Sequence, residues 1–192
     1  MNSIISLDHA FFKLINQAWS NEAFDVFFPL ITDLHKTMMF KIVLVVLLLS
    51  LHIYKLKKWG PVFTLLCFLS MALTDFSGNE LFKKNFNRSR PFEISELQTQ
   101  QRSPAKTGSS FISNHSANMF ALATLNVLLM PSTAPLFITV AFLSAYSRVY
   151  NGVHFPSDVI AGAFWGAFVS YLIFLLWQKL IVTKLTQKRS VK

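Results

Sequence analysis

The sequence contains a single cysteine, Cys67, so no disulfide bond can form within the chain and a cysteine-based metal cluster is not expected. Charged residues are also scarce, at 14% of the 192 residues, whereas 53% are hydrophobic. This balance is poor in charge and rich in apolar side chains compared with a typical soluble domain. The composition therefore argues against disulfide-stabilised and zinc-stabilised folds and favours a protein that is largely embedded in a membrane.

Long apolar runs account for this composition. Val159 to Gln178 is a run of twenty residues without a charge, and 37–54 contains only Lys41 as a charged residue. A helix needs roughly 20 apolar residues to cross the hydrocarbon layer of a bilayer. We therefore predict an all-α fold, a polytopic membrane helix bundle of about five transmembrane helices at 37–54, 59–82, 115–130, 135–150 and 159–182.

The first 36 residues have a different character. They hold four acidic residues and lack a basic start followed by an apolar block, so no cleavable signal peptide is expected. Between Leu7 and Trp19, apolar residues recur at helical spacing. This pattern predicts an amphipathic helix that lies in the membrane interface or packs against the bundle. We expect one domain over 1–192, with an interfacial region at 1–36, the bundle at 37–182 and a basic cytoplasmic tail at 183–192.

Basic residues orient the predicted helices, because loops rich in Lys and Arg favour the cytoplasm. Such residues lie between the first two helices and again after the last one. With five helices, the loop 55–58, the turn 131–135 and the C-terminus share the cytoplasmic side. The net charge of +9 does not suggest nucleic acid, because the cations form no continuous face or stripe.

The loop 83–114 breaks this rule. It carries six basic residues although it lies on the predicted outer side, where positive charge should be rare. Two interpretations are open, a binding site for an anion or a solvated loop that meets anionic lipid headgroups.

Three clusters of polar residues at the outer ends of the helices carry the chemistry. Lys83 and Arg90, in KKNFNRSRP, could grip phosphate oxygens, Arg90 with two parallel hydrogen bonds. The second cluster, SFISNHSAN at 110–118, begins a predicted helix, where free backbone N–H groups and the helix dipole favour an anion. Ser113 or Asn114 could equally be an ordinary helix N-cap.

The third cluster is SRVYNGVHFPSD at 147–158. Asp158 lies four residues after His154, and a carboxylate beside an imidazole can fix its tautomer and leave the other ring nitrogen free as a nucleophile. Pro156, Ser157 and Asp158 also read as the start of the last helix. The predicted topology brings all three clusters to one face of the membrane.

In this order, Lys-x6-Arg-Pro, Ser-x-His and Ser-Arg-x5-His-x3-Asp resemble the three-part signature of type 2 phosphatidic acid phosphatases. The resemblance implies that His154 attacks phosphorus, that Asp158 orients it, and that His115 protonates the leaving oxygen. It implies phosphoryl binding by five further residues: Lys83, Arg90, Ser113, Asn114 through its backbone N–H, and Arg148. It implies neither a metal nor another cofactor.

Asn114 departs from the family pattern, which has glycine before the histidine. Asn tolerates left-handed backbone conformations better than most residues, so the turn can survive. Its side chain would crowd the phosphate or donate a hydrogen bond to it. Asp75, within a predicted span, lies one turn before Asn79 and is expected to form a structural polar ladder with it.

The resemblance to short bacterial members implies a multi-pass protein of the bacterial inner membrane, with its active site facing the periplasm or exterior. The substrate stays open among undecaprenyl pyrophosphate, lipid A phosphate, phosphatidylglycerol phosphate and phosphatidic acid. No protein partner is inferable. Two alternatives are a vanadium haloperoxidase, although those are soluble, and a catalytically silent lipid-binding or transport protein on the same fold.

The topology can be tested with single cysteines. We expect Gln100→Cys to react with an impermeant thiol reagent in intact spheroplasts and Gln187→Cys to react only after lysis, because basic loops orient the helices. The parent chain, which has Cys67 alone, sets the background. Labelling of Gln187→Cys before lysis would refute this orientation.

Overall fold

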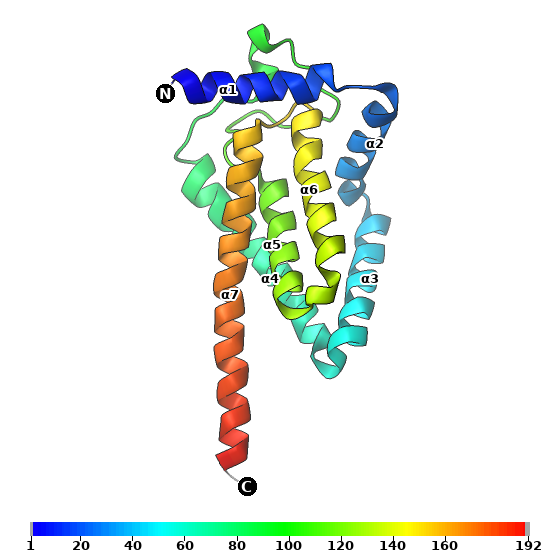
Figure 1. Cartoon of the computed structure of the whole chain (residues 1–192), viewed down its shortest axis with the longest axis vertical. Helices are drawn as coiled ribbons and strands as arrows, with labels where there is room; N and C mark the ends of the chain where they lie inside the picture. Colours follow the sequence, from blue (N-terminus) through cyan, green and yellow to red (C-terminus); the bar gives the residue numbers. More distant parts are fainter. Residues whose placement is uncertain (1, 191–192) are drawn as a thin grey trace.

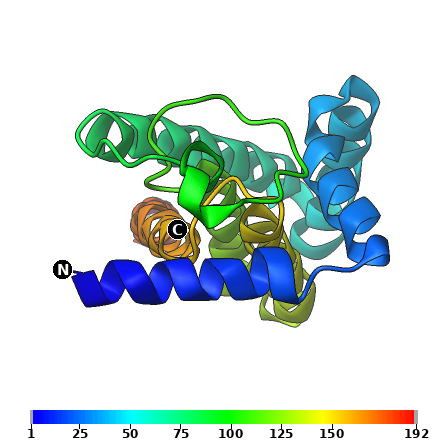
Figure 2. The same cartoon turned by 90° about the horizontal axis from the view of Figure 1, so that it is seen from above.

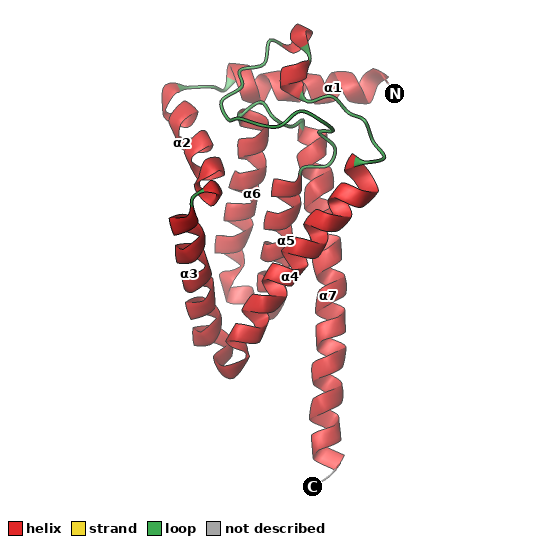
Figure 3. Ribbon diagram, turned by 180° about the vertical axis from the view of Figure 1, so that it is seen from behind, coloured by secondary structure: helices red, strands yellow, loops and turns green. Residues whose placement is uncertain are grey.

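The computed structural model describes residues 2–190 and is all-α over that range, with helices and loops only (Figure 3). The α-helices of this part of the chain are α1 (Asn2–Lys13), α2 (Glu22–Asp33), α3 (Met38–Leu56), α4 (Gly60–Gly78), α5 (Asn114–Leu129), α6 (Ala134–Tyr150) and α7 (Pro156–Ser190). Two π-helical segments extend α1 and α4: η1 (Leu14–Ala18) and η4 (Asn79–Lys83). The short 3-10 turns are η2 (Leu34–Lys36), η3 (Lys57–Trp59), η5 (Pro91–Glu93), η6 (Ser95–Leu97) and η7 (Pro131–Thr133).

Each of the five helices predicted from apolar runs is present, as α3 to α7. Their observed bounds differ from the predicted ones by a few residues, except at the C-terminus. There α7 continues through Ser190, so the predicted tail at 183–192 is helical over 183–190. Residues 191–192 and the side chains beyond Lys179 lie outside the described part of the structure.

Within the described residues, two stretches are long and apolar enough to cross a membrane by length and composition, Met38–Lys83 and Pro156–Lys179. The first contains α3 and α4, which reverse direction at η3. With 16 and 17 residues, α5 and α6 are shorter than the roughly 20 residues of a typical span. Apolar side chains nevertheless cover the outer faces of α3, α4, α6 and α7, among them Leu47, Leu65, Phe142, Phe164 and Leu176.

The N-terminal region differs from the prediction of one amphipathic helix over 7–19. Helix begins at Asn2, and a second helix, α2, follows at Glu22 and lies end to end with α3 at one edge of the bundle (Figures 1 and 3). Asn21 caps α2, because its side-chain oxygen accepts a hydrogen bond from the Phe24 N–H at 3.0 Å. This helix was missed because acids and Pro29 interrupt its apolar pattern, although its N-cap signal stands in the sequence.

Helix α1 lies across one end of the bundle, over the ends of α6 and α7 (Figures 1 and 2). It buries Asp8, Phe12 and, in η1, Asn16 against the bundle. Leu7 and Phe11, from the predicted apolar stripe, are instead exposed, at 59% and 49%. The helix therefore packs on the bundle with one face and offers an apolar face outward.

The chain turns that matter for topology gather at two opposite ends. The turns η3 and η7 and the C-terminus of α7 lie at one end (Figure 1). Helix α1, the loop 84–113 and the loop 151–155 lie at the other. This is the grouping that the sequence predicted, and it brings the three polar clusters to one end of the molecule.

The tightest helix pair is α5 with α7, and two glycines of α7 make it possible. A Cβ atom on Gly162 would lie 2.5 Å from the Ser113 backbone oxygen, and one on Gly166 would lie 1.9 Å from the Ala117 oxygen. This Gly-x-x-x-Gly spacing lets two helix backbones touch. Ser116 Oγ donates to the Val159 oxygen at 2.6 Å along the same seam. The first turns of α5 and α7 are thereby held side by side.

Gly166→Ala should lower stability by about 1–3 kcal/mol, because the added methyl group must push two backbones apart. We expect a lower midpoint of thermal unfolding in detergent, together with lower activity per folded molecule. Gly78→Ala is the matched control, since its Cβ would meet no backbone atom but two side-chain ends, the Asn114 oxygen at 3.3 Å and the Ile112 Cδ1 atom at 3.8 Å. Equal midpoints for Gly166→Ala and the parent protein would contradict this account of the seam.

Candidate active site

The centre of the site is a buried histidine–carboxylate pair at the junction of α6 and α7. His154 is 3% exposed and Asp158 is fully buried. Asp158 Oδ2 accepts a hydrogen bond from the Phe155 N–H at 2.8 Å, so the carboxylate is fixed by the first turn of α7, as in a capping box. His154 Nδ1 lies 3.5 Å from the same oxygen, which is long for a hydrogen bond. Such contacts commonly shorten when a substrate binds.

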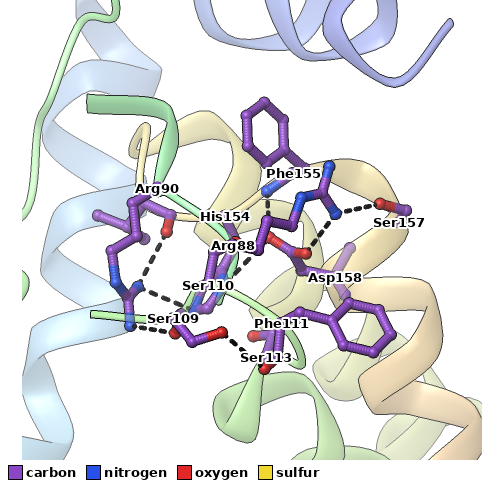
Figure 4. Close-up of polar contacts among 12 residues, drawn as sticks. Arg88, Arg90, Ser109, Ser110, Phe111, Ser113, His154, Phe155, Ser157 and Asp158 are labelled. Atoms are coloured by element: carbon purple, nitrogen blue, oxygen red, sulfur yellow. Dashed lines mark hydrogen bonds and ion pairs between the residues drawn. The ribbon is translucent and has the colours of Figure 1, made fainter. Parts of the chain in front are cut away.

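Two predicted phosphate ligands, Lys83 and Arg90, converge beside this pair. Lys83 Nζ donates to the Ser109 oxygen at 3.3 Å, and Arg90 Nη2 lies 3.5 Å from the same oxygen. Arg90 Nη1 donates to the Val153 oxygen at 3.0 Å and lies 3.4 Å from His154 Nε2 (Figure 4). One cation therefore stands directly beside the ring nitrogen that faces away from Asp158.

Arg148 reaches the same region from the end of α6. Its backbone oxygen accepts hydrogen bonds from Val153 N and His154 N at 3.2 and 3.3 Å, so its position and that of His154 are linked. The guanidinium is almost fully buried. The Nε atoms of Arg90 and Arg148 have no hydrogen-bond partner within the described part of the chain. Buried donors of this kind are normally paired, so both arginines are suited to an anion.

The Ser-Asn-His cluster forms the first turn of α5 and meets the pair from the other side. Ser113 is the N-cap, and its backbone N–H donates to the backbone oxygen of Asp158 at 3.0 Å. Its Oγ accepts a weak hydrogen bond from Ser116 N, at 3.5 Å. The predicted N-cap role of Ser113 is thus present, and its hydroxyl hydrogen stays available to an anion. His115 follows two residues later, in the same helical turn.

The Asn114 side chain was expected either to crowd a bound phosphate or to donate a hydrogen bond to it, and its contacts fit neither expectation. Its Nδ2 donates to Asp75 Oδ1 at 2.9 Å and to Asn79 Oδ1 at 3.0 Å. Asn79 Nδ2 lies 3.3 Å from Asp75 Oδ2, so the expected polar ladder along α4 exists and includes Asn114. The side chain is therefore held on α4 instead of lying over the phosphoryl position.

Sequence reasoning gave no role to Arg88, which hydrogen-bonds the carboxylate of the pair, or to Asp8, which pairs with Arg88. Arg88 Nη1 donates to Asp158 Oδ1 at 2.6 Å and to Ser157 Oγ at 2.7 Å (Figure 4). Its Nη2 is ion-paired with Asp8 Oδ2 of α1. The Arg-x-Arg spacing in the basic loop was the only signal for Arg88. No local pattern connects Asp8 with a residue 80 positions away.

Two other cations of the basic loop, Lys84 and Arg102, make contacts away from the pair. Lys84 pairs with Glu80 on the surface at 2.6 Å. Arg102 pairs with Asp25 at 2.7 Å and covers the ring of Tyr150, with 4.6 Å from Cζ to the ring centroid. The first part of the loop, up to Arg90, therefore places cations beside the histidine–carboxylate pair, and its second part anchors the N-terminal helices.

Burial sets the charge states at the site. It lowers the pKa of His154 to about 4, and the hydrogen bond and charge of Asp158 only partly oppose this shift. Asp158 accepts hydrogen bonds from the Arg88 guanidinium and from the Phe155 N–H, as a carboxylate does. At neutral pH the pair thus consists of a neutral imidazole and a carboxylate. Burial, together with the charge of Arg90, lowers the pKa of Lys83 to about 8.

A cavity of about 250 Å³ opens beside the pair and is lined by Phe86, Asn87, Arg88 and Phe111. Phe82 extends its aromatic wall, because this ring contacts Phe86, Phe111 and Trp165. The site therefore adjoins an apolar surface. Among the described residues, no group of three or more His, Cys, Asp or Glu side chains is arranged to hold a metal ion.

A family model described as the PAP2 superfamily matches residues 63–181, which is more than half of the chain. The chain belongs to the PAP2 superfamily. The match begins in α4 and runs into α7, so it contains all three polar clusters. The resemblance inferred from the three-part signature is confirmed at the level of this family.

Individual relatives agree with the PAP2 assignment. The lipid A 4'-phosphatase of Bacteroides thetaiotaomicron is 31% identical over 118 residues, which cover 58% of this chain and 52% of that relative. The chain spans about half the length of the curated relatives it matches. LpxE of Aquifex aeolicus superposes with a TM-score of 0.69 at 28% identity, over 88% of this chain and 94% of that one.

A second solved PAP2 structure is similar in fold. The transmembrane PAP2-type phosphatidylglycerolphosphate phosphatase of Bacillus subtilis superposes with a TM-score of 0.72 over 93% of this chain and 88% of that one. The sequence identity is 24%, so this likeness supports the helical architecture alone. Separately from this likeness, the chain has apolar stretches of span length, Met38–Lys83 and Pro156–Lys179.

The pH dependence of phosphatase activity should follow the two shifted groups of this PAP2 site. We expect kcat/KM to rise with pH through about 4, as His154 loses its proton, and to fall above about 8, as Lys83 loses its charge. Lys83→Arg should move the alkaline fall to higher pH, because a guanidinium keeps its charge there. Lys84→Arg is the surface control. An alkaline fall unchanged in Lys83→Arg would contradict the assignment.

Proposed function

We propose that this PAP2 protein is an integral membrane lipid phosphatase that removes a terminal phosphate or pyrophosphate group through a phosphohistidine at His154. The observation that carries this proposal is a buried neutral imidazole, held by Asp158 and surrounded by three cations. Two of those cations, Arg90 and Arg148, have unpartnered buried N–H groups. Fixed positive groups around a nucleophile stabilise the charge that develops on a phosphoryl group in the transition state of its transfer.

The chemical steps use this geometry directly. His154 Nε2 attacks phosphorus, forming a nitrogen–phosphorus bond as the bond between phosphorus and the lipid oxygen breaks. His115 gives its proton to that leaving oxygen, while Asp158 stabilises the positive charge on the His154 ring. Water then attacks the phosphohistidine, His115 takes up its proton, and phosphate leaves. Arg90 stands 3.4 Å from the attacking nitrogen and binds the phosphoryl oxygens with Lys83, Arg148, Ser113 and the Asn114 N–H.

An amphiphilic substrate suits the surroundings. The polar pair and the aromatic cavity share Arg88 as a common wall, so a phosphate at His154 can carry an apolar chain past Phe86 and Phe111. The candidates remain undecaprenyl pyrophosphate, lipid A phosphate, phosphatidylglycerol phosphate and phosphatidic acid. The lipid A 4'-phosphatase among the relatives makes lipid A phosphate the first to test.

The same proposal places the protein in the bacterial inner membrane with five spans, α3 to α7, and α1 in the outer interface. The helices α5 and α6 are shorter than a typical span. They pack between longer helices, which shield their ends from the lipid. The outward apolar face of α1, with Leu7 and Phe11, suits the level of the headgroups. The basic turn at 55–58 then lies in the cytoplasm and the site in the periplasm or exterior.

The alternative function is a catalytically silent lipid-binding or transport protein on the same fold. It gives no reason for His154 and Asp158 to stay intact and buried together, because binding alone needs only cations. The other alternative, a vanadium haloperoxidase, would be a soluble protein and is disfavoured by the apolar stretches Met38–Lys83 and Pro156–Lys179.

The deciding experiment measures phosphate release by the purified protein in detergent from the four candidate lipids, with excess EDTA present. We expect turnover of at least one lipid, inhibition by orthovanadate, and an acid-labile, alkali-stable phosphoenzyme. His154→Ala should lose activity by several orders of magnitude, because a nucleophile acts as part of a unit. Its thermal unfolding should stay cooperative, which excludes a folding defect.

Two results would overturn the proposal. One is activity that disappears in EDTA and returns with a divalent ion, since a metal would then do the work assigned to the arginines. The other is normal turnover in folded His154→Ala. Release from none of the four lipids, with orthovanadate bound, would favour the silent alternative.

A further inference from the structure

Arg88 makes a set of contacts that the phosphoryl-transfer steps do not use. One guanidinium nitrogen, Nη1, reaches Asp158 Oδ1 at 2.6 Å, and the other, Nη2, is ion-paired with Asp8 of α1. Asp8 in turn accepts from Ser157 N at 2.9 Å and from Ser157 Oγ at 2.6 Å. The result is a closed network that joins α1, the basic loop and the first turn of α7.

This network fixes both oxygens of the Asp158 carboxylate. Oδ2 is held by the Phe155 N–H and faces His154 Nδ1, whereas Oδ1 is held by Arg88. A carboxylate bound at one oxygen can rotate about its last side-chain bond. With both oxygens bound it cannot, and the oxygen facing His154 keeps its direction.

Burial makes the contact consequential. Asp158 is fully buried and Asp8 is 7% exposed, so water compensates poorly for a lost partner at either carboxylate. The Arg88 guanidinium also lies over the Phe155 ring, 4.3 Å from its centroid, and His9 of α1 stacks on that ring at 5.0 Å. Helix α1 therefore supports Arg88 through a charge and through an aromatic ring.

We propose that Arg88 is a positioning residue that orients Asp158 toward His154, and that Asp8 of α1 holds Arg88 in that position. Seating of the N-terminal helix on the bundle thereby completes the histidine–carboxylate pair. The inference rests on the proposed function, because Asp158 acts through His154 only if His154 is the nucleophile. Arg88 itself contacts neither His154 nor any residue assigned to the phosphoryl oxygens, so its role is distinct from those of Arg90 and Arg148.

The loop supplies a matched control in Arg102. Like Arg88, it pairs with an acid of the N-terminal region, Asp25, and covers an aromatic ring, Tyr150. Unlike Arg88, it contacts no residue of the histidine–carboxylate pair. A purely structural anchor would make the two arginines equivalent, and a positioning residue would not.

The test compares kcat and KM for Arg88→Ala, Asp8→Ala and Arg102→Ala in the full-length protein. We expect Arg88→Ala to lower kcat by about 100-fold, as for an outer partner of a reactive group, with KM within about threefold. Asp8→Ala should lower kcat less, by roughly tenfold, and should add little in the Arg88→Ala background, because both residues act on one carboxylate. Arg102→Ala should lower thermal stability and leave kcat within about twofold of the parent.

Chemical rescue and pH profiles separate orientation from stability. The Arg88 side chain borders the open cavity at Phe86 and Phe111, so millimolar guanidinium should restore part of kcat in Arg88→Ala and none in His154→Ala. The acid limb of kcat/KM should move to higher pH in Arg88→Ala, because the loss of a neighbouring cation makes the His154–Asp158 pair easier to protonate. Arg102→Ala should keep the parent profile.

Spectra of ¹⁵N-labelled histidine give a readout that does not depend on turnover. The His154 signals, identified by their loss in His154→Ala, should show a changed tautomer balance in Arg88→Ala and in Asp8→Ala. Arg102→Ala should leave them unchanged.

The outcomes separate this inference from the proposed function. If the parent enzyme is active but Arg88→Ala raises KM without lowering kcat, Arg88 binds substrate and the positioning role is wrong. The positioning role would also be wrong if Arg88→Ala and Arg102→Ala lowered kcat equally and in proportion to the fall in their unfolding midpoints. An inactive parent defeats the proposed function, and the histidine spectra then decide alone whether Arg88 orients the pair.

Discussion

The site depends on one contact between backbones, the seam where α5 meets the start of α7. Gly162 and Gly166 bring the backbones of α5 and α7 so close that the Ser113 N–H donates to the Asp158 backbone oxygen at 3.0 Å. Through this contact the helix that carries His115 begins beside the helix that carries Asp158. Neither helix could be moved along the other without losing that hydrogen bond. The relative position of the two halves of the site is therefore a property of the packing, not of a flexible loop.

Charge is arranged around the seam so that the site favours an anion before any substrate arrives. Lys83, Arg90 and Arg148 surround a histidine that burial keeps neutral at pH 7. A protonated His154 would add a fourth positive charge and remove the nucleophile at once. The cations and the low pKa of His154 thus support each other, since the positive neighbours oppose its protonation. A bound phosphoryl group would in turn relieve the repulsion among the cations.

The sequence predicted what depends on local pattern. Apolar runs located α3 to α7 within a few residues at nearly every end, and motif spacing identified His154, Asp158 and Arg90 as neighbours. It did not predict what depends on contacts between distant segments. Arg88 looked like one cation among six, and its role became visible only with Asp8 of α1 beside it. Helix α2 was missed because its apolar face is interrupted by acids that pair with the loop, as Asp25 does with Arg102.

Asn114 shows how such distant contacts let a motif vary. Glycine is usual before the histidine because a side chain there could intrude on the phosphoryl group. Here Asp75 and Asn79 on α4 accept the amide of Asn114 and hold it to one side. Gly78 leaves the room, since a Cβ at that position would lie 3.3 Å from the Asn114 oxygen. Asp75 is thereby stabilised within an apolar helix. One exchange at position 114 is thus compatible with the chemistry because three residues of a neighbouring helix accommodate it.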